Sequence, residues 1–237
     1  MKQLLFCGLL FISAAATSQR VIDIDKNDAN PTDSKLLMIV GGNPLGNTKY
    51  VRIVSGTPYF SETWMKGKVL ISGGKMYGGV RFRLDLLDNS LQYINGDGRE
   101  MIATSPVTNI VLTDSISGKE YLFAHQSTLP PSKDLQKGWY QVLSDGKGAT
   151  LYMHNAKSIQ ETRPYGTATY EQHIRDFNQY YIQTDSAFTL VKKFNSIPDV
   201  LSDKKDELTA YIKSQKLSGK STEDYTALID YYNSLFK

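Results

Sequence analysis

The glycine-rich segment at residues 41–48 follows an apolar run, as a phosphate-binding loop follows a strand. In that motif a lysine reaches the outer phosphates, a hydroxyl binds magnesium and a helix begins directly afterwards. Here Asn47 stands at the lysine position, Pro44 removes one backbone N–H, and residues 49–54 have the character of a strand. The pattern therefore predicts a hairpin loop and no nucleotide cofactor.

Three oxygen-bearing residues, Asp23, Asp25 and Asn27, match the first ligands of a calcium-binding loop. Asp28 occupies the position that requires glycine for the sharp turn, and Ser34 occupies the position of the bidentate glutamate. Because the turn and the strongest ligand are both missing, we expect a solvated arm and no calcium.

The three histidines, His125, His154 and His173, fall in different segments. None of them belongs to an H-E-x-x-H motif or to a pair at i and i+4, so the spacing predicts no metal site. Glu171 and Asp176 are close to His173 in sequence, but nothing in the pattern fixes their geometry. The sequence therefore predicts neither a metal ligand nor a catalytic histidine.

Four carboxylates lie in one hairpin region and are candidates for acid and base catalysis. They are Asp85, Asp88, Asp97 and Glu100. Asp85 shares a predicted strand face with Arg81 and Arg83, and cross-strand ion pairing explains its presence without catalysis.

Aromatic side chains at the rim of a sheet can stack on sugars and other flat ligands. Trp64 and Trp139 fall at predicted loops or strand edges and are our candidate ligand-binding residues. Most of the 15 tyrosines and 9 phenylalanines are better explained as core and rim packing, because aromatic residues are good strand formers.

The first residues have the pattern of a cleaved export leader. Met1 and Lys2 precede an apolar run at residues 4–12, and alanines follow at residues 14–16. The only cysteine, Cys7, lies inside this leader. We expect residues 1–18 to be a signal peptide and the mature chain to have no disulfide, thiolate nucleophile or cysteine-ligated metal. The predicted location is periplasmic or extracellular.

The charge balance excludes some partners. The 27 basic and 24 acidic residues are interspersed, whereas a nucleic-acid binder needs a concentrated basic face. After the leader the longest apolar run is residues 36–40, far shorter than the roughly 18 residues of a membrane span. We therefore expect no nucleic-acid partner and no membrane-spanning segment.

Short β-branched and aromatic runs separated by glycine turns fill residues 35–157 and predict an antiparallel meander. The clearest strand alternates apolar and charged residues from Val80 to Leu86. Further strands are expected at residues 50–54, 69–72, 91–94, 101–104, 108–113, 120–124, 140–143, 150–154, 180–183 and 188–191. We interpret residues 126–138, with their two prolines, as a surface loop. Residues 158–178 are interpreted as a connection that could hold a helical turn at 170–177.

After Lys193 the apolar period changes from two to 3.6. Ser196 with Asp199, and Ser221 with Asp224, match variants of the capping box. The last helix carries one apolar stripe, made of Tyr225, Leu228, Ile229, Tyr232, Leu235 and Phe236. We predict helices over residues 203–217 and 222–236, which Gly219 separates into a helical hairpin.

Several of these segments together resemble a known group of proteins. They are a lysine-valine strand, a Gly-Gly turn, the hairpin RFRLDLLDNSLQYI and the helical ending DKKDELTAYIKSQKL with EDYTALIDYYNSL. They resemble uncharacterised small exported β-rich proteins of Bacteroidota, over residues 67–124 and 180–235. The resemblance implies export and a β-rich fold, and it assigns no functional residue.

We predict an α+β fold that is mainly β, in which an antiparallel meander forms a curved sheet or half-barrel with a C-terminal helical hairpin. The predicted organisation is a flexible arm at residues 19–34, a β domain at 35–193 and a helical hairpin at 194–237 packed on it.

We favour an exported, non-enzymatic cell-envelope protein that acts in binding or assembly, with an envelope protein, a glycan or an apolar ligand as its partner. Two alternatives remain open: a carrier of a lipid or other apolar ligand in a half-barrel cavity, and a small hydrolase that depends on carboxylates or histidine. A filled interior favours the first, a large apolar cavity the second and converging titratable groups the third. No catalytic residue, metal or cofactor is predicted.

Overall fold

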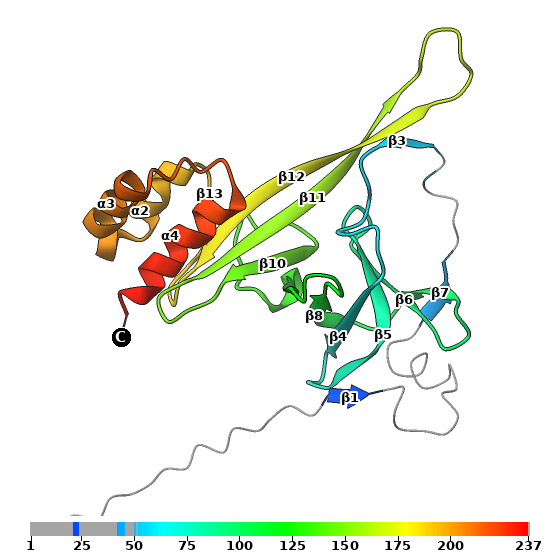
Figure 1. Ribbon diagram of the computed structural model, residues 1–237, viewed down its shortest axis with the longest axis horizontal. Coiled ribbons are helices and arrows are strands. Elements are labelled where there is room, and N and C mark those ends of the chain that lie inside the picture. The colour runs from blue at the N-terminus through cyan, green and yellow to red at the C-terminus, as the bar shows by residue number, and fades with distance from the viewer. Residues whose placement is uncertain (1–20, 24–41, 46–49, 51, 237) are drawn as a thin grey trace, which may run out of the picture.

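The computed structural model describes residues 21–23, 42–45, 50 and 52–236. Its strands form one open, curved sheet, and the helices gather at one end of the molecule on the last strands of that sheet (Figure 1). This arrangement confirms the predicted fold class, a mainly β α+β fold with an antiparallel meander and a C-terminal helical hairpin.

The strands follow the order β13-β12-β11-β10-β9-β8-β4-β5-β6-β7-β2 across the sheet, and these neighbours are antiparallel. The first group comprises β4 (Met65–Ile71), β5 (Met76–Asp85), β6 (Ser90–Ile94), β7 (Glu100–Ala103) and β8 (Val107–Thr113). The second group comprises β9 (Glu120–His125), β10 (Trp139–Ser144), β11 (Thr150–Thr162), β12 (Glu171–Gln183) and β13 (Phe188–Val191).

Three short strands from the N-terminal part of the chain complete the sheet. They are β1 (Val21–Asp23), β2 (Gly42–Pro44) and β3 (Ile53–Ser55). β1 pairs in parallel with β5, and β3 pairs in parallel with β12, so the sheet is mixed at these two places. The rest of the arm predicted at residues 19–34 lies outside the described residues.

The C-terminal segment consists of short helical turns followed by two longer helices. They are η2 (Phe194–Ser196), α2 (Ile197–Val200), η3 (Ser202–Lys204), α3 (Lys205–Gln215) and α4 (Thr222–Ser234), while η1 (Gln126–Thr128) follows β9. Among the described residues, no helix has both the length and the apolar character that crossing a membrane requires.

One of the two predicted helix caps is confirmed. The hydroxyl of Ser221 accepts a hydrogen bond from the backbone N–H of Asp224 at 3.3 Å, which satisfies a free donor at the start of α4. The cap predicted at Ser196 is wrong, because its hydroxyl instead donates to the Lys193 carbonyl at 2.7 Å. Ser196 already has helical backbone angles, so its side chain points back along the chain and not toward α2.

The sheet is packed on both faces where β10 to β13 lie. On one face Leu151 and Ile182 contact the helices, and the buried stripe of α4, including Leu228 and Ile229, packs there. On the other face the side chains that alternate with them meet the loop after β9. They are Tyr140, Tyr152, Tyr181 and Phe188. A strand covered on both sides lacks polar alternation, which explains the continuous buried run at residues 151–154.

A separate apolar cluster lies between β4, β5, β6 and β8, and its largest fully buried side chains include Phe82, Tyr93 and Ile110. Trp139 of β10 also belongs to this cluster and joins it to the second half of the sheet.

The connection predicted at residues 158–178 is wrong. β11 and β12 pair without interruption from Thr150 with Gln183 to Thr162 with Glu171, and they form one long hairpin. Arg163, Pro164 and Gly166, which suggested a loop, lie in the turn at its tip. In Figure 1 this hairpin begins under the helices and crosses the molecule, and its turn projects beyond the other described elements.

Candidate functional site

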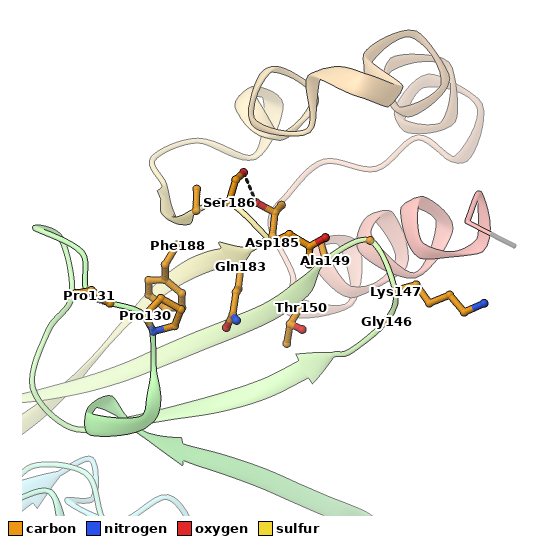
Figure 2. Close-up of a pocket in the computed structure, with 13 residues that line it drawn as sticks. Pro130, Pro131, Gly146, Lys147, Ala149, Thr150, Gln183, Asp185, Ser186 and Phe188 are labelled. Carbon is orange, nitrogen blue, oxygen red and sulfur yellow. Dashed lines mark hydrogen bonds between the residues drawn. The ribbon is translucent and has the colours of Figure 1, made fainter. Parts of the chain in front are cut away.

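A pocket of about 500 Å³ lies at the end of the sheet beside α4, between three turns (Figure 2). One wall is the loop after β9 at Pro130 and Pro131. The second is the β10–β11 turn at residues 146–149, and the third is the β12–β13 turn at residues 184–187. Thr150 and Gln183, which face each other in the β11–β12 register, line the pocket between the two hairpin turns. This volume is within the range of pockets that hold small molecules.

Helix α4 holds the second wall in position through Asn233. Its Oδ1 accepts hydrogen bonds from the backbone N–H groups of Gly148 and Ala149 at 3.1 and 2.9 Å, and its Nδ2 donates to the Ala149 carbonyl at 2.9 Å. The turn approaches the helix so closely that a Cβ on Gly148 would lie 2.5 Å from the ring of Phe236. Glycine is therefore required there for the turn to reach Asn233.

The polar groups of the pocket include both donors and acceptors. The Tyr152 hydroxyl donates to Gln183 Oε1 at 3.1 Å, which leaves Gln183 Nε2 as a donor. The Thr150 hydroxyl donates to Asp145 Oδ1 at 2.6 Å, which leaves the Thr150 oxygen as an acceptor. Burial raises the pKa of Tyr152, so its hydroxyl keeps the proton that fixes the Gln183 amide.

Two charged residues line the pocket, Lys147 and Asp185, and within the described part of the chain neither makes an ion pair or a side-chain hydrogen bond. In Figure 2 the Lys147 side chain extends away from the other labelled residues, into solvent. Phe188 and Pro130 supply the apolar part of the wall, and the ring of Phe188 is fixed by stacking on Tyr181 at 5.2 Å between centroids.

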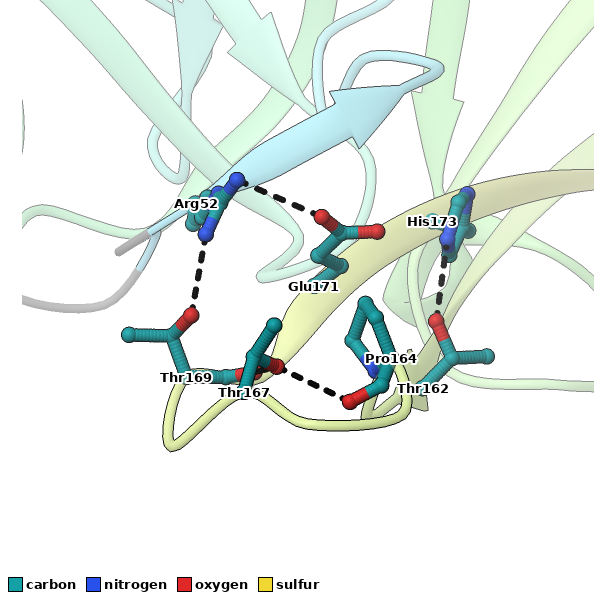
Figure 3. A network of polar contacts seen from close by, with 7 residues as sticks. All are labelled: Arg52, Thr162, Pro164, Thr167, Thr169, Glu171 and His173. Carbon is teal, nitrogen blue, oxygen red and sulfur yellow. Dashed lines mark hydrogen bonds and ion pairs between the residues drawn. The ribbon is translucent and has the colours of Figure 1, made fainter.

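The tip of the β11–β12 hairpin is a second candidate site, and polar contacts fix its conformation (Figure 3). Arg52 Nη1 donates to Thr169 Oγ1 at 2.9 Å, and its Nη2 lies 3.3 Å from Glu171 Oε1. Within the turn, Arg163 Nε donates to the Thr167 carbonyl at 2.9 Å, and Thr167 Oγ1 donates to the Pro164 carbonyl at 3.0 Å. Exposed contacts of this kind add little stability, but together they limit the conformations of the turn.

Large apolar side chains are exposed along this hairpin. Tyr165 in the turn is fully exposed, and Tyr170 and Phe177 are 55% and 61% exposed. The Arg163 guanidinium lies 5.7 Å from the centroid of the Tyr170 ring, on one side of it. Exposed aromatic residues on a projecting element are typical of binding surfaces.

His173 lies near the hairpin tip between two hydroxyl groups. Its Nδ1 is 2.9 Å from Ser55 Oγ, and its Nε2 is 3.2 Å from Thr162 Oγ1. A serine and a histidine at hydrogen-bond distance could form a nucleophile and base pair. Here the second ring nitrogen contacts a hydroxyl where a catalytic histidine needs a carboxylate, and the group lies on an exposed strand surface. The contact therefore joins β3 to β12 and gives no support to hydrolysis.

His154 belongs to the core, and His125 is half-buried. His125 stacks edge-on against Trp139, and His154 lies flat on Tyr140 with ring centroids 4.7 Å apart. Burial lowers the pKa of both imidazoles. His154 Nε2 donates to the Lys137 carbonyl at 3.1 Å. Across the described residues, no group of three or more His, Cys, Asp and Glu side chains could hold a metal ion.

The two tryptophans predicted as ligand-binding residues lie in different environments. Trp139 is 4% exposed, and its indole N–H donates to the Asn89 carbonyl at 3.2 Å. The ring of Trp64 is half-buried, and the Arg83 guanidinium lies 4.2 Å from its centroid and 4.0 Å from that of Tyr59. Both rings are thus engaged in contacts within the protein.

Asp85, among the carboxylates considered for catalysis, is 1% exposed and holds the turn after β5. It accepts hydrogen bonds from the backbone N–H groups of Leu87 and Asp88 and from the Tyr50 hydroxyl at 2.6 Å. Burial and this contact raise the pKa of Tyr50. Arg83, predicted as an ion-pair partner of Asp85, pairs with Glu100 at 3.3 Å.

The phosphate-loop and calcium-loop segments fall largely outside the described residues. Gly42–Pro44 of the first segment forms the strand β2 and pairs with β7, so these three residues lie in the sheet and not in the predicted hairpin loop. Asp23 of the second segment belongs to β1, while Asp25, Asn27, Asp28 and Ser34 are outside the described residues.

No protein-family model, curated protein or solved structure matches this chain. The pocket and the tip of the β11–β12 hairpin are therefore the features that bear on its function.

Neither the pocket nor the long hairpin was predicted from the sequence. The pocket arises from three turns that lie far apart in sequence, so no local pattern signals it. The hairpin had a visible signal, because the β-branched residues Ile159 and Ile174 lie symmetrically about the turn at residues 163–170, and they are paired in the structure.

Proposed function

We propose that this chain is an exported, non-enzymatic binding protein of the cell envelope that attaches to a partner protein through the tip of its β11–β12 hairpin. The observation that carries the proposal is the full exposure of Tyr165 on a turn that projects beyond the rest of the described structure. An aromatic side chain held away from the core loses little conformational entropy on binding and buries a large apolar area.

The contacts of Arg52 support this proposal, because they come from outside the hairpin. Arg52 precedes β3 in the chain and reaches both Thr169 and Glu171, so the base of the turn is tied to another part of the sheet. An ordered turn loses less conformational entropy on binding than a flexible turn does. The hairpin tip is thus preorganised for recognition.

The interior of the protein also favours binding over the two alternatives. Buried side chains pack between the helices and the sheet and between the sheet and the loop, and the pockets at these places are open to solvent and partly polar, so they give little support to an apolar carrier. The three histidines remain in separate contacts, which removes support for a hydrolase based on histidine.

Site-specific photo-crosslinking tests the proposal. A photoreactive phenylalanine analogue is introduced at Tyr165 and, in a second variant, at Ile116, which is 96% exposed in a different turn. In cells that naturally make the protein, we expect one discrete adduct from position 165 and none from position 116. Because both positions are open to solvent, non-specific collisions would label them equally.

Variants without the aromatic side chains give the second arm of the experiment. Tyr165→Ser with Tyr170→Ser should abolish an adduct formed from a photoreactive group at Gln160, an exposed position on the same hairpin. The same adduct should survive Tyr231→Ser, which changes a tyrosine of α4 at the opposite end. The absence of any adduct at position 165, or equal adducts at 165 and 116, would refute the proposal.

A further inference from the structure

We infer that the pocket between Pro130, the β10–β11 turn and the β12–β13 turn binds a neutral carbohydrate ring (Figure 2). This site is separate from the hairpin tip, and the inference does not depend on the proposed function. It rests on the chemistry of the pocket wall and on the rigidity of the turns that form it.

A sugar hydroxyl both donates and accepts hydrogen bonds, so a carbohydrate needs both kinds of group around it. Gln183 Nε2 is held as a donor because the Tyr152 hydroxyl occupies the amide oxygen. The Thr150 oxygen is held as an acceptor because its proton goes to Asp145. Asp185 adds a carboxylate that accepts from two hydroxyls and has no competing partner in the described residues.

The apolar part of the wall suits the C–H face of a sugar ring. Phe188 and Pro130 lie on one side of the pocket, opposite the turn that contains Gly148. Phe188 cannot turn freely, because it stacks on Tyr181 and is only 7% exposed. A fixed apolar wall opposite paired polar groups is the composition that orients a small polar ligand.

The charges argue against an anionic ligand. Lys147 extends into solvent in Figure 2, so the charge that remains beside the turns is the carboxylate of Asp185. This carboxylate would repel a phosphate or a free carboxylate. A neutral polyol avoids this repulsion and uses the same oxygens as hydrogen-bond acceptors.

Saturation-transfer difference NMR on the full mature chain tests the inference. The probes are glucose, galactose, N-acetylglucosamine, maltose and chitobiose, with ethanolamine and inorganic phosphate as charged probes. We expect at least one neutral sugar to give signals that persist in 0.5 M NaCl, because the contact carries no net charge on the ligand. A disaccharide that binds more tightly than its monosaccharide would indicate a glycan chain, and the reverse order a free sugar.

Three variants link the signal to the pocket. Gln183→Glu keeps the acceptor for Tyr152 and removes the Nε2 donor, and Asp185→Ala removes an exposed carboxylate without disturbing the core. Asp185→Ala should weaken sugar binding by about tenfold or more, because a hydrogen bond to a charged group contributes that much. Gln183→Glu should weaken it by about two- to tenfold, because the donor that it removes is a neutral amide. Gln160→Glu on the hairpin is the matched control and should leave binding unchanged.

Three outcomes would overturn the inference. In the first, none of the five sugars binds the wild-type chain at 10 mM. In the second, sugar signals survive unchanged in both Gln183→Glu and Asp185→Ala. In the third, ethanolamine or phosphate binds while every sugar fails, which would make the pocket a site for a charged ligand.

Discussion

The two halves of the β11–β12 hairpin have the same strand pairing and opposite surroundings. Near the helices, Leu151 and Ile182 are fully buried against α4, and Tyr181 is fully buried against the loop after β9. From the Ala156–Phe177 pair toward the tip the same two strands continue in unbroken register, and Phe177 is more than half exposed. Backbone pairing therefore continues where side-chain burial becomes sparse, with Gln172 and Ile174 as buried residues of the distal half. The half near the helices supplies most of the buried side chains, and the distal half presents the exposed ones.

Removing the helices that cover the half near them, or removing the distal half itself, should give the largest contrast. A chain that ends at Lys193 lacks α2, α3 and α4 and exposes the apolar face at Leu151 and Ile182, so we expect it to lose cooperative unfolding and to aggregate. Replacing residues 160–173 by an Asn-Gly turn should keep a cooperative transition, because that segment supplies none of the fully buried side chains. Thermal unfolding followed by circular dichroism, with light scattering, compares the two. A soluble, cooperative truncated chain would contradict this division.

Single substitutions sharpen the same contrast. Leu151→Ala leaves a cavity between sheet and helices and should lower the free energy of unfolding by about 2–5 kcal/mol. Phe177→Ala in the distal half should change it by less than about 0.5 kcal/mol, because the ring is already exposed. Urea unfolding at pH 7.5 measures both values. Similar losses for the two variants would mean that the distal half is covered in solution.

The hydrogen bonds of Asn233 offer a smaller test. Asn233→Ala removes three contacts between α4 and the β10–β11 turn, and we expect a loss of about 1–3 kcal/mol in the free energy of unfolding. Asn178→Ala makes the same chemical change on the exposed hairpin and should have no measurable effect. If Asn233→Ala also leaves the free energy of unfolding unchanged, the β10–β11 turn does not depend on α4 for its position.

The smallest expected effect depends on pH. Burial lowers the pKa of His154 below its ordinary value of 6.5, so the unfolded chain takes up the proton first as the pH falls. Stability should therefore be complete above about pH 6.5 and should fall below it, toward the pKa of the folded state. His154→Phe keeps the stack on Tyr140 and should reduce the difference in urea midpoint between pH 7.5 and 5.5. An unchanged difference would assign the pH dependence to other groups, such as the half-buried His125.

Local patterns predicted most strands and both longer helices. The alternation of apolar and charged residues from Val80 to Leu86 predicted β5. In the apolar stripe predicted for α4, four residues are buried: Tyr225, Leu228, Ile229 and Tyr232. Ser196 failed as a cap because a short 3₁₀ turn precedes α2, which a motif of four residues does not reveal.

The long hairpin was missed for a physical reason. Its distal strands are mostly exposed and mixed in polarity, and one of their buried side chains is the polar Gln172, so their sequence lacks the apolar–polar alternation that identifies a strand with one buried face. The pocket was missed because Pro130, Gly148 and Asp185 approach only through the sheet order, which a single sequence does not specify. A binding site formed by segments that are distant in sequence can be recognised only once the fold is known.

The parallel pairing of β3 with β12 has a mechanical consequence. Gln172 and His173 pair with Ile53 and Ser55, and the Gln172 N–H donates to the Arg52 carbonyl at 2.9 Å. A tensile load applied at the hairpin tip along its axis would act in shear across this pairing, so its hydrogen bonds would share the force and not break one by one. The load would also reach β4 through the connection that follows β3. β3 would therefore transmit tension from the hairpin tip to the first half of the sheet.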